Sequence, residues 1–188
     1  RIAGTDRAVD FATLAGKAKQ PEDLKGLGEF TAEECTYPNG THICEVEIDP
    51  ETGALEMVAY TVVDDFGVVV NPLLLQGQVH GGIVQGIGQA LTEGTVYAED
   101  GQLLTASFMD YAMPRAADLP MFAWEGHHVP STINPLGIKG AGEAGTIGAT
   151  PAALNAVTDA LYRAYGITHI EMPTTPQRIW QAIQSAKQ

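Results

Sequence analysis

Two runs of β-forming residues around a short turn constrain the fold of this chain more than any other feature. Residues 42–49 (HICEVEID) alternate apolar and polar side chains, and residues 54–65 (ALEMVAYTVVDD) are rich in β-branched and aromatic types. The residues between them, 50–53 (PETG), are typical of a turn. Two such runs around a glycine-containing turn predict an antiparallel β-hairpin, with one face of each strand directed toward a core.

A long helix is predicted after the hairpin. Asn71 is a suitable N-cap, Pro72 suits the first helical position, and the helix should extend to about Glu93. One face carries apolar residues at every fourth position, namely Leu75, Val79, Ile83, Ile87 and Leu91. The opposite face carries Gln78, Gly82, Gln85 and Gln89.

The same helix contains glycines at positions 77, 81, 82, 86 and 88. Each should weaken a helix interior by about 1 kcal/mol relative to alanine. Something must therefore lie very close to the helix backbone. Tight packing against the sheet and a ligand on the Gly/Gln face both account for this composition.

Turn signals punctuate the rest of the chain. Residues 95–98 and 103–109 form a candidate strand pair around the turn at 99–101 (EDG), and residues 122–129 form a further candidate strand. A glycine-rich loop follows over residues 137–148.

Capping signals predict the remaining helices. One helix is predicted over residues 151–165, with Thr150 as its N-cap and Gly166 as its stop. A last helix should begin at Thr175-Pro176, and a short one lies within residues 2–18. Antiparallel hairpins packed with helices indicate an α+β fold rather than a doubly wound parallel sheet.

Composition and charge exclude several classes of protein. The chain has 188 residues, with 23 acidic and 10 basic side chains and a net charge of −13. Such a protein repels phosphate backbones, so we expect no nucleic-acid partner. No run approaches the roughly 18 consecutive apolar residues of a membrane span, and no secretory signal is visible. Two cysteines, Cys35 and Cys44, are too few for a disulfide framework, so we expect a reduced, cytoplasmic setting.

Residues 140–145 (GAGEAG) match the G-x-G-x-x-G pattern of dinucleotide-binding loops. That fingerprint needs a buried strand before it and an acidic residue ending a second strand about 20 residues later, and neither context occurs here. The loop still exposes backbone N–H groups before a helix, which can hold an anionic cofactor. A small-molecule or nucleotide-binding module that uses the Gly140–Gly145 loop is therefore an alternative function. Glu143 is either a carboxylate favoured by the helix dipole or a functional group.

Three segments carry motifs in a fixed order. Residues 63–72 (VDDFGVVVNP) contain D-x-G-x-x-x-N-P, residues 77–88 (GQVHGGIVQGIG) contain G-Q-x-x-G-x-x-x-Q-G-x-G, and residues 138–145 (IKGAGEAG) contain K-G-x-G-E. Together they resemble the large subunits of the molybdenum hydroxylases, the family of xanthine dehydrogenase, aldehyde oxidoreductase and aerobic carbon monoxide dehydrogenase. The similarity extends from about Thr36 to the end of the chain.

The resemblance implies roles for six residues. The glutamate that matches Glu143 acts in this family as general base on a hydroxyl bound to molybdenum, and this hydroxyl attacks an electron-poor carbon. The glutamine that matches Gln78 hydrogen-bonds the pterin that carries the metal. Four glycines imply close approach of the backbone to the cofactor, namely Gly81, Gly82, Gly140 and Gly142. The metal takes no protein ligand in this family, so we expect no metal-ligating residue.

Cofactors and partners follow from the same resemblance. The cofactor would be molybdenum-molybdopterin cytosine dinucleotide, with iron-sulfur clusters and FAD on partner subunits or domains. The substrate would be a small molecule, namely an aldehyde, an N-heterocycle or carbon monoxide, whose identity the chain does not specify. We expect the complete enzyme to combine the remainder of the large subunit, an iron-sulfur subunit and an FAD subunit, and to form a dimer of this assembly.

The expected organisation also follows from the family, whose large subunits are several times longer than this chain. We expect residues 1–35 to be a linker or partial upstream segment and residues 36–188 to be the C-terminal molybdopterin-binding domain. The chain alone should be inactive. Asp64 and Asp65 are interpreted as polar groups at a strand end, and His80 as a packed or exposed helix residue. The pair His127-His128 is interpreted as a surface pair on a strand or loop.

Overall fold

The computed structural model describes residues 4–187, and the chain divides into two compact units, residues 1–33 and 34–188. The first unit contains the short helix α1 (Phe11–Ala15) and the 3₁₀ turn η1 (Pro21–Leu24), neither of which has a buried residue. Helix α1 confirms the short helix expected within residues 2–18, of which Ile2 and Ala3 lie outside the described residues. That the first thirty-five residues form an upstream segment stays a prediction.

The second unit is built on the predicted hairpin. Strands β1 (Asn39–Ile48) and β2 (Leu55–Asp65) pair in antiparallel register, with an irregularity between Glu45 and Val46. A third strand, β3 (Ala123–Gly126), lies beside β2 in the order β1-β2-β3. This strand is shorter than the predicted 122–129 and runs parallel to β2, so the sheet is mixed rather than purely antiparallel.

Helix α2 (Pro72–Leu91) begins as its sequence predicts and ends two residues before the predicted Glu93. The Asn71 side chain accepts a hydrogen bond from the backbone N–H of Leu74 at 3.1 Å, and Pro72 occupies the first turn. The predicted apolar stripe faces the core: Leu75 is half-buried, and the other four members are buried, namely Val79, Ile83, Ile87 and Leu91.

Helix α3 (Ala144–Tyr165) begins seven residues before the predicted start, and Pro151 lies inside it. The prediction that Pro151 occupies the first helical position is wrong. Two extra turns form because small residues at Gly145 and Ala149 let α3 pack tightly against the glycines of α2. The predicted end is confirmed, since Gly166 adopts the left-handed conformation with φ of 72°.

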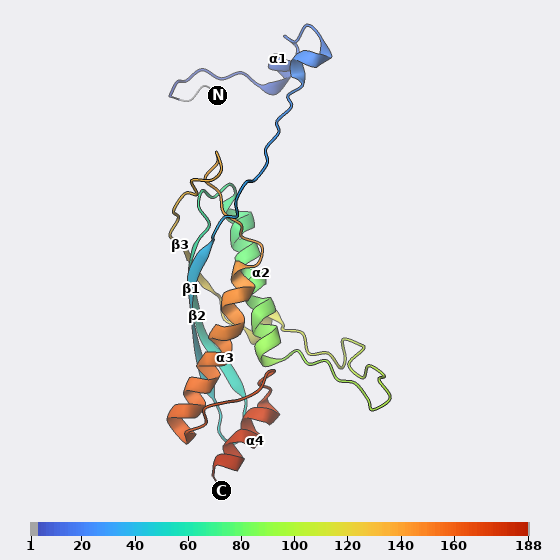
Figure 1. Ribbon diagram of the computed structural model, residues 1–188, viewed down its shortest axis with the longest axis vertical. Helices are drawn as coiled ribbons and strands as arrows, with labels where there is room; N and C mark the ends of the chain where they lie inside the picture. Colours follow the sequence, from blue (N-terminus) through green and yellow to red (C-terminus); the bar gives the residue numbers. More distant parts are fainter. Residues whose placement is uncertain (1–3, 188) are drawn as a thin grey trace. The chain divides into compact units, whose positions relative to one another are not determined.

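Two other segments complete the second unit. Helix α4 (Pro176–Ala186) begins at the predicted Thr175-Pro176, with the Thr175 hydroxyl accepting from the N–H of Arg178 at 3.5 Å. The predicted strand pair at 95–98 and 103–109 does not form regular strands. It is reduced to an isolated bridge between Tyr97 and Leu103, with a backbone hydrogen bond from Leu104 N–H to the Val96 carbonyl beside it. This segment leaves α2 as an extended loop that ends at the 3₁₀ turn η2 (Ala116–Asp118), and no strand of the sheet pairs with it (Figure 1).

The core lies between the sheet and the two long helices. Helices α2 and α3 run side by side, and α3 also packs against β1 (Figure 1). The largest fully buried apolar side chains come from β2 and all three helices of this unit, and include Tyr60, Ile83, Ile87, Leu161, Ile179 and Ile183. Among residues 4–187, no helix has both the length and the hydropathy of a membrane span. The second unit is thus an α+β fold, as predicted.

Candidate functional site

Two of the motif segments meet through one hydrogen bond. The side-chain Nε2 of Gln78, on α2, donates to the carbonyl oxygen of Gly142 at 2.7 Å. Glu143 follows directly and occupies the N-cap position of α3. Its side chain is exposed and accepts no N–H group from the first turn of the helix. The structure therefore brings Gln78 beside Glu143 and leaves the Glu143 carboxylate outside the capping role that its position allows.

A cleft of about 420 Å³ opens beside Glu143. One wall is the loop before α3 and its first turns, with Gly140, Gly142, Glu143, Ile147 and Gly148. The other wall comes from the start of β1 and the end of β2, with Thr36, Asn39, Gly40, His42 and Asp64. The hairpin, the loop before α3 and the first turns of α3 thus form the cleft together, and Glu143 lines it.

A buried polar cluster includes two residues of the β-sheet wall of the cleft, His42 and Asp64. The Nδ1 atom of His42 and the hydroxyl of Tyr60 lie 2.6 Å apart and share a hydrogen bond. The indole Nε1–H of Trp124 donates to Asp64 Oδ2 at 3.3 Å. Asp64 Oδ1 lies 3.8 Å from His42 Nε2, too far for a hydrogen bond. Asp64 is only 2% exposed, so it is a buried carboxyl group and not merely a polar side chain at the end of a strand.

Burial governs protonation in this cluster. Burial lowers the pKa of His42, which favours the neutral ring. Burial raises the pKa of Asp64, although the hydrogen bond from Trp124 partly opposes the shift. Burial also raises the pKa of Tyr60. The cluster therefore consists of neutral aromatic side chains around the carboxyl group of Asp64, whose pKa is raised.

Asp65 forms the strongest ion pair of the site. Its Oδ2 atom lies 2.6 Å from Lys139 Nζ, and the two side chains are 9% and 12% exposed. Its Oδ1 atom accepts from the backbone N–H groups of Gly67 and Val129 at 2.9 and 3.0 Å. Burial raises the pKa of Asp65, but the hydrogen bond from Lys139 and the two backbone bonds outweigh it. The pKa therefore lies well below its usual range.

The glycines of α2 separate into two groups. A Cβ atom at Gly86 would lie 2.8 Å from the Thr146 carbonyl oxygen, and one at Gly82 would lie 3.0 Å from the Thr146 nitrogen. These two glycines, both buried, are required for contact with α3. A Cβ atom at Gly77 or Gly81 would meet nothing within 4 Å. The close neighbour of Gly82 and Gly86 is thus α3 and not the sheet, so the expected packing against the sheet is wrong at these positions. A ligand beside the open glycines, Gly77 and Gly81, stays a prediction.

The glycines of the loop before α3 have free space beside them. A Cβ atom at Gly142 would meet no atom within 4 Å, and one at Gly140 would reach only the hydroxyl of Thr36 at 4.0 Å. The backbone N–H of Gly140 donates to that hydroxyl at 3.1 Å. No regular strand precedes this loop, since Ile138 forms only an isolated bridge with Gly67. The context of a dinucleotide-binding fingerprint is therefore missing.

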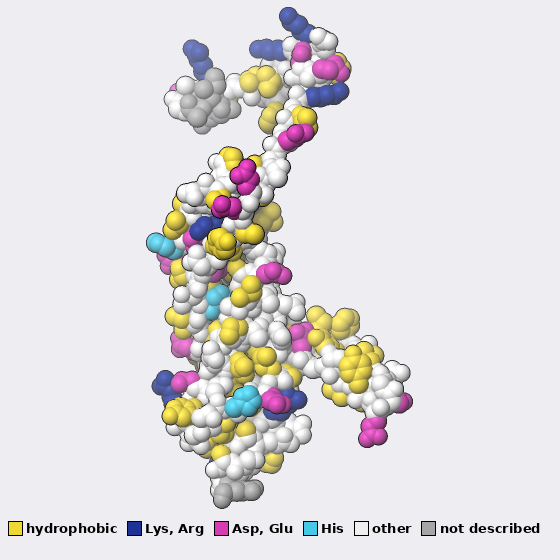
Figure 2. Space-filling view, in the orientation of Figure 1, with side chains coloured by type: hydrophobic (Ala, Val, Ile, Leu, Met, Phe, Trp, Pro, Cys, Tyr) yellow, Lys and Arg dark blue, Asp and Glu magenta, His cyan; other side chains and the backbone are white. Residues whose placement is uncertain are grey.

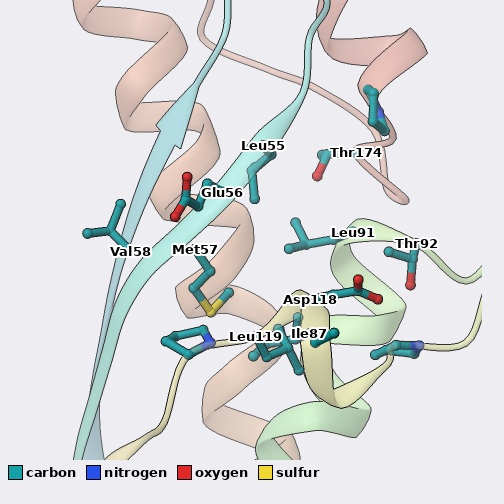
Figure 3. A pocket seen from close by; sticks show the side chains of 14 residues that line it. Leu55, Glu56, Met57, Val58, Ile87, Leu91, Thr92, Asp118, Leu119 and Thr174 are labelled. Carbon is teal, nitrogen blue, oxygen red and sulfur yellow. The ribbon is translucent and has the colours of Figure 1, made fainter.

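The remaining candidates lie apart from Glu143. His80 packs edge-to-face against Phe122, with ring centroids 5.6 Å apart. His127 and His128 are exposed, and His128 Nδ1 accepts from the N–H of Phe66 at 3.4 Å. No group of three or more potential metal-ligating side chains occurs among residues 4–187. A larger, mainly apolar hollow of about 580 Å³ is lined by β2, α2 and η2 residues, and none of the predicted site residues lines it (Figure 3).

Sequence reasoning missed four site residues, namely His42, Asp64, Asp65 and Lys139. Asp65 and Lys139 belong to the first and last of the three motifs, yet nothing in one sequence shows that they pair across 74 positions. Their presence in motifs was the available signal. His42 lay within an alternating strand pattern that carries no functional signal.

Comparison with known proteins identifies the family. Residues 1–120 match the model of the family described as Molybdopterin cofactor-binding domain. The chain is 42% identical over 178 residues to the nicotine 6-hydroxylase large subunit of Paenarthrobacter nicotinovorans, covering 93% of this chain and 22% of the relative. It is 35% identical over 158 residues to the carbon monoxide dehydrogenase large chain of Afipia carboxidovorans, covering 84% of this chain and 19% of that relative.

The fold agrees with these sequence matches. The solved structure of reconstituted CO dehydrogenase from Oligotropha carboxidovorans superposes with a TM-score of 0.77 and 36% identity, over 80% of this chain and 19% of that chain. The chain thus spans about a fifth of the length of the relatives described here. The motifs, the family model and the fold agree, and the chain belongs to the molybdopterin cofactor-binding domain family of the molybdenum hydroxylase large subunits.

Proposed function

We propose that the chain is part of the catalytic large subunit of a molybdenum hydroxylase, with Glu143 as the general base. The observation that carries this proposal is the hydrogen bond from Gln78 to Gly142, which holds Glu143 at an open cleft. The Glu143 side chain makes no capping hydrogen bond, so its carboxylate is not engaged with the first turn of α3.

The residues that line the cleft, Gly140 and Gly142, and those near them on α2, Gln78 and Gly81, fit an anionic pterin cofactor. Gln78 offers an amide donor and acceptor, and the N-terminus of α3 offers backbone N–H groups with a positive dipole end. Gly81 and Gly142 leave open space where side chains would stand, so a ligand can approach the backbone there. Gly82, which was also predicted to approach the cofactor, faces α3 instead, and this contact explains why a glycine occupies the position. Gln78, Gly81, Gly140 and Gly142 would hold the group.

The chemistry divides between cofactor and protein. When bound, the molybdenum cofactor supplies the two-electron oxidation and an oxygen atom derived from water. The chain itself supplies orientation, through Gln78 and the loop, and a proton acceptor at a carboxylate oxygen of Glu143.

The complete enzyme is inferred from the family. The cofactor would be the cytosine dinucleotide form, and iron-sulfur clusters and FAD would lie on partner subunits or domains that carry the electrons away. The rest of the large subunit would close the cleft and select the substrate. The names of the relatives include nicotine and carbon monoxide, which favours a small molecule as the substrate. A cytoplasmic dimer of the whole assembly remains part of this proposal.

The test is Glu143→Gln in the complete enzyme. Glutamine is nearly isosteric and still hydrogen-bonds, but it takes up no proton at neutral pH. A lost general base should lower turnover about 10²–10⁴-fold while folding and molybdenum content stay normal. Loss of a mere dipole partner should cost only about 0.3–1 kcal/mol of stability and leave turnover intact.

A matched control is Glu51→Gln, in the exposed turn between β1 and β2, which makes the same chemical change away from the cleft. This control should keep wild-type turnover. A fully loaded Glu143→Gln enzyme with turnover within a few-fold of wild type would refute the proposed role.

A further inference from the structure

Three bonds that involve distant side chains attach the loop that carries Glu143 to the rest of the domain. The Lys139 side chain is bound by Asp65, the Gly140 N–H by the Thr36 hydroxyl, and the Gly142 carbonyl by Gln78. Only the first of these three is an ion pair, and only the first is largely buried. The loop has no strand or helix of its own before α3, so these bonds and its backbone bonds to the end of β2 determine its course.

Asp65 connects three separate segments through one carboxylate. One oxygen accepts from Gly67 in the turn after β2 and from Val129 in the segment after β3, and the other binds Lys139. The backbone N–H of Lys139 also donates to the carbonyl of Phe66 at 2.9 Å. Both the main chain and the side chain of Lys139 are therefore fastened to the end of β2.

The contact between the two segments is also close. Gly67 has a φ of 64°, and a Cβ atom there would overlap the carbonyl oxygen of Gly137. The Val68 N–H donates to this same carbonyl at 2.9 Å. The loop from Gly137 to Glu143 thus packs closely against the end of β2 at its Gly137 end. The largely buried ion pair stabilises that arrangement only while both partners are present.

We propose that Asp65 is a positioning residue for Glu143, acting through Lys139 to fix the loop that presents the carboxylate to the cleft. The inference rests on the proposed function of Glu143. Its physical basis is that a displacement of about 1 Å in a reacting group can cost on the order of 100-fold in rate. Asp65 touches neither Glu143 nor the open part of the cleft, so it acts only through the loop.

The first experiment measures the loop itself, without cofactor or activity. Hydrogen exchange of the 188-residue chain should be compared for wild type, Lys139→Gln and Asp65→Asn. The Gln variant keeps the two backbone bonds of Asp65, so the fold should survive even if the Asn variant is unstable. Amides of residues 137–145 should exchange about tenfold faster or more, while those of β1 and α4 stay unchanged.

The control variant is Asp159→Asn, which removes the carboxylate of an exposed ion pair with Arg163 on α3. Its loop should exchange at the wild-type rate. Lys139→Arg keeps the charge and should restore protection of the loop. Unchanged exchange of residues 137–145 in Lys139→Gln would overturn the positioning role, whatever Glu143 does.

The second experiment uses the complete enzyme. Lys139→Gln should lower kcat about 10–100-fold with nearly constant KM and molybdenum content, and Lys139→Arg should recover most of it. In a Glu143→Gln background, Lys139→Gln should have no further effect, because the group being positioned is gone. Fully additive losses would contradict the inference. A normal Glu143→Gln enzyme would instead refute the proposed function while leaving the exchange result intact.

Discussion

At the scale of single residues, the two cysteines should differ in reactivity. Cys44 is half-buried in β1, and Cys35 is exposed. Burial, with a smaller effect of the neighbouring Glu45 carboxylate, raises the pKa of Cys44 to about 11. Only the thiolate reacts with alkylating reagents. At pH 8, iodoacetamide should therefore modify Cys35 and spare Cys44 in the folded chain, as peptide mass spectrometry would show.

The raised pKa of Cys44 also makes the stability of the folded chain depend on pH. The folded-state pKa of Cys44 exceeds the value of about 8.5 typical of an unfolded chain. The contribution of Cys44 to stability is therefore complete below about pH 8.5 and is lost as the pH rises toward 11. A Cys44→Ser variant lacks this ionisation, so its free energy of unfolding should decline less over that window. In the iodoacetamide experiment, labelling of Cys35 and Cys44 at equal rates in the native chain would show that the burial assigned to Cys44 is wrong.

The site residues show what one sequence reveals. Gln78 and Glu143 were predicted from motifs, and the structure places them within one hydrogen-bonded unit. The ion pair of Asp65 and Lys139 could not be predicted, because its partners come from different motifs and meet only after the sheet and loop have formed. Patterns reveal residue types and local periodicity, but pairing across the fold depends on packing.

At the scale of elements, the glycines of α2 allow a matched pair of substitutions. Gly86→Ala places a methyl group 2.8 Å from the Thr146 carbonyl oxygen, whereas Gly77→Ala places one in open space. We expect Gly86→Ala to destabilise the chain by about 1–3 kcal/mol through overpacking. Gly77→Ala should stabilise it by about 0.5–1 kcal/mol through helix propensity. Urea unfolding of both variants measures the difference, and equal effects of the two would disprove the division of faces.

The two long helices also show where sequence signals fail. Asn71-Pro72 and Thr150-Pro151 look alike, yet the first pair begins α2 and the second lies inside α3. The difference lies in the preceding residues. The segment before Asn71 contains Gly67 with a φ of 64° and is not helical, whereas the residues before Thr150 pack onto α2 through Gly145. The hydroxyl of Thr150 donates to the Gly86 carbonyl at 3.2 Å instead of capping a helix. Tertiary packing thus overrides a favourable cap.

At the scale of the whole molecule, the second unit exposes large apolar side chains on the loop between α2 and β3. Phe108 and Met109 in this loop are 82% and 93% exposed. Hydrophobic side chains gather on the part of the chain that projects from the second unit (Figure 2). Exposed apolar side chains gathered in this way are typical of an interface. The relatives are about five times longer than this chain. The proposal that the rest of the large subunit covers this loop would account for its exposed apolar side chains.

The cleft leads to a last prediction about cofactor retention. The described residues offer the cofactor one amide side chain, a few backbone N–H groups and open space at Gly81 and Gly142. A ligand held on one side by so few groups gains little against the entropy lost on binding. The 188-residue chain, purified from cells that make the cofactor, should therefore contain no stoichiometric molybdenum by elemental analysis. The complete large subunit from the same cells should contain close to one equivalent. Stoichiometric metal in the short chain would mean that its own residues suffice, and that the cleft, although open, already binds the cofactor tightly.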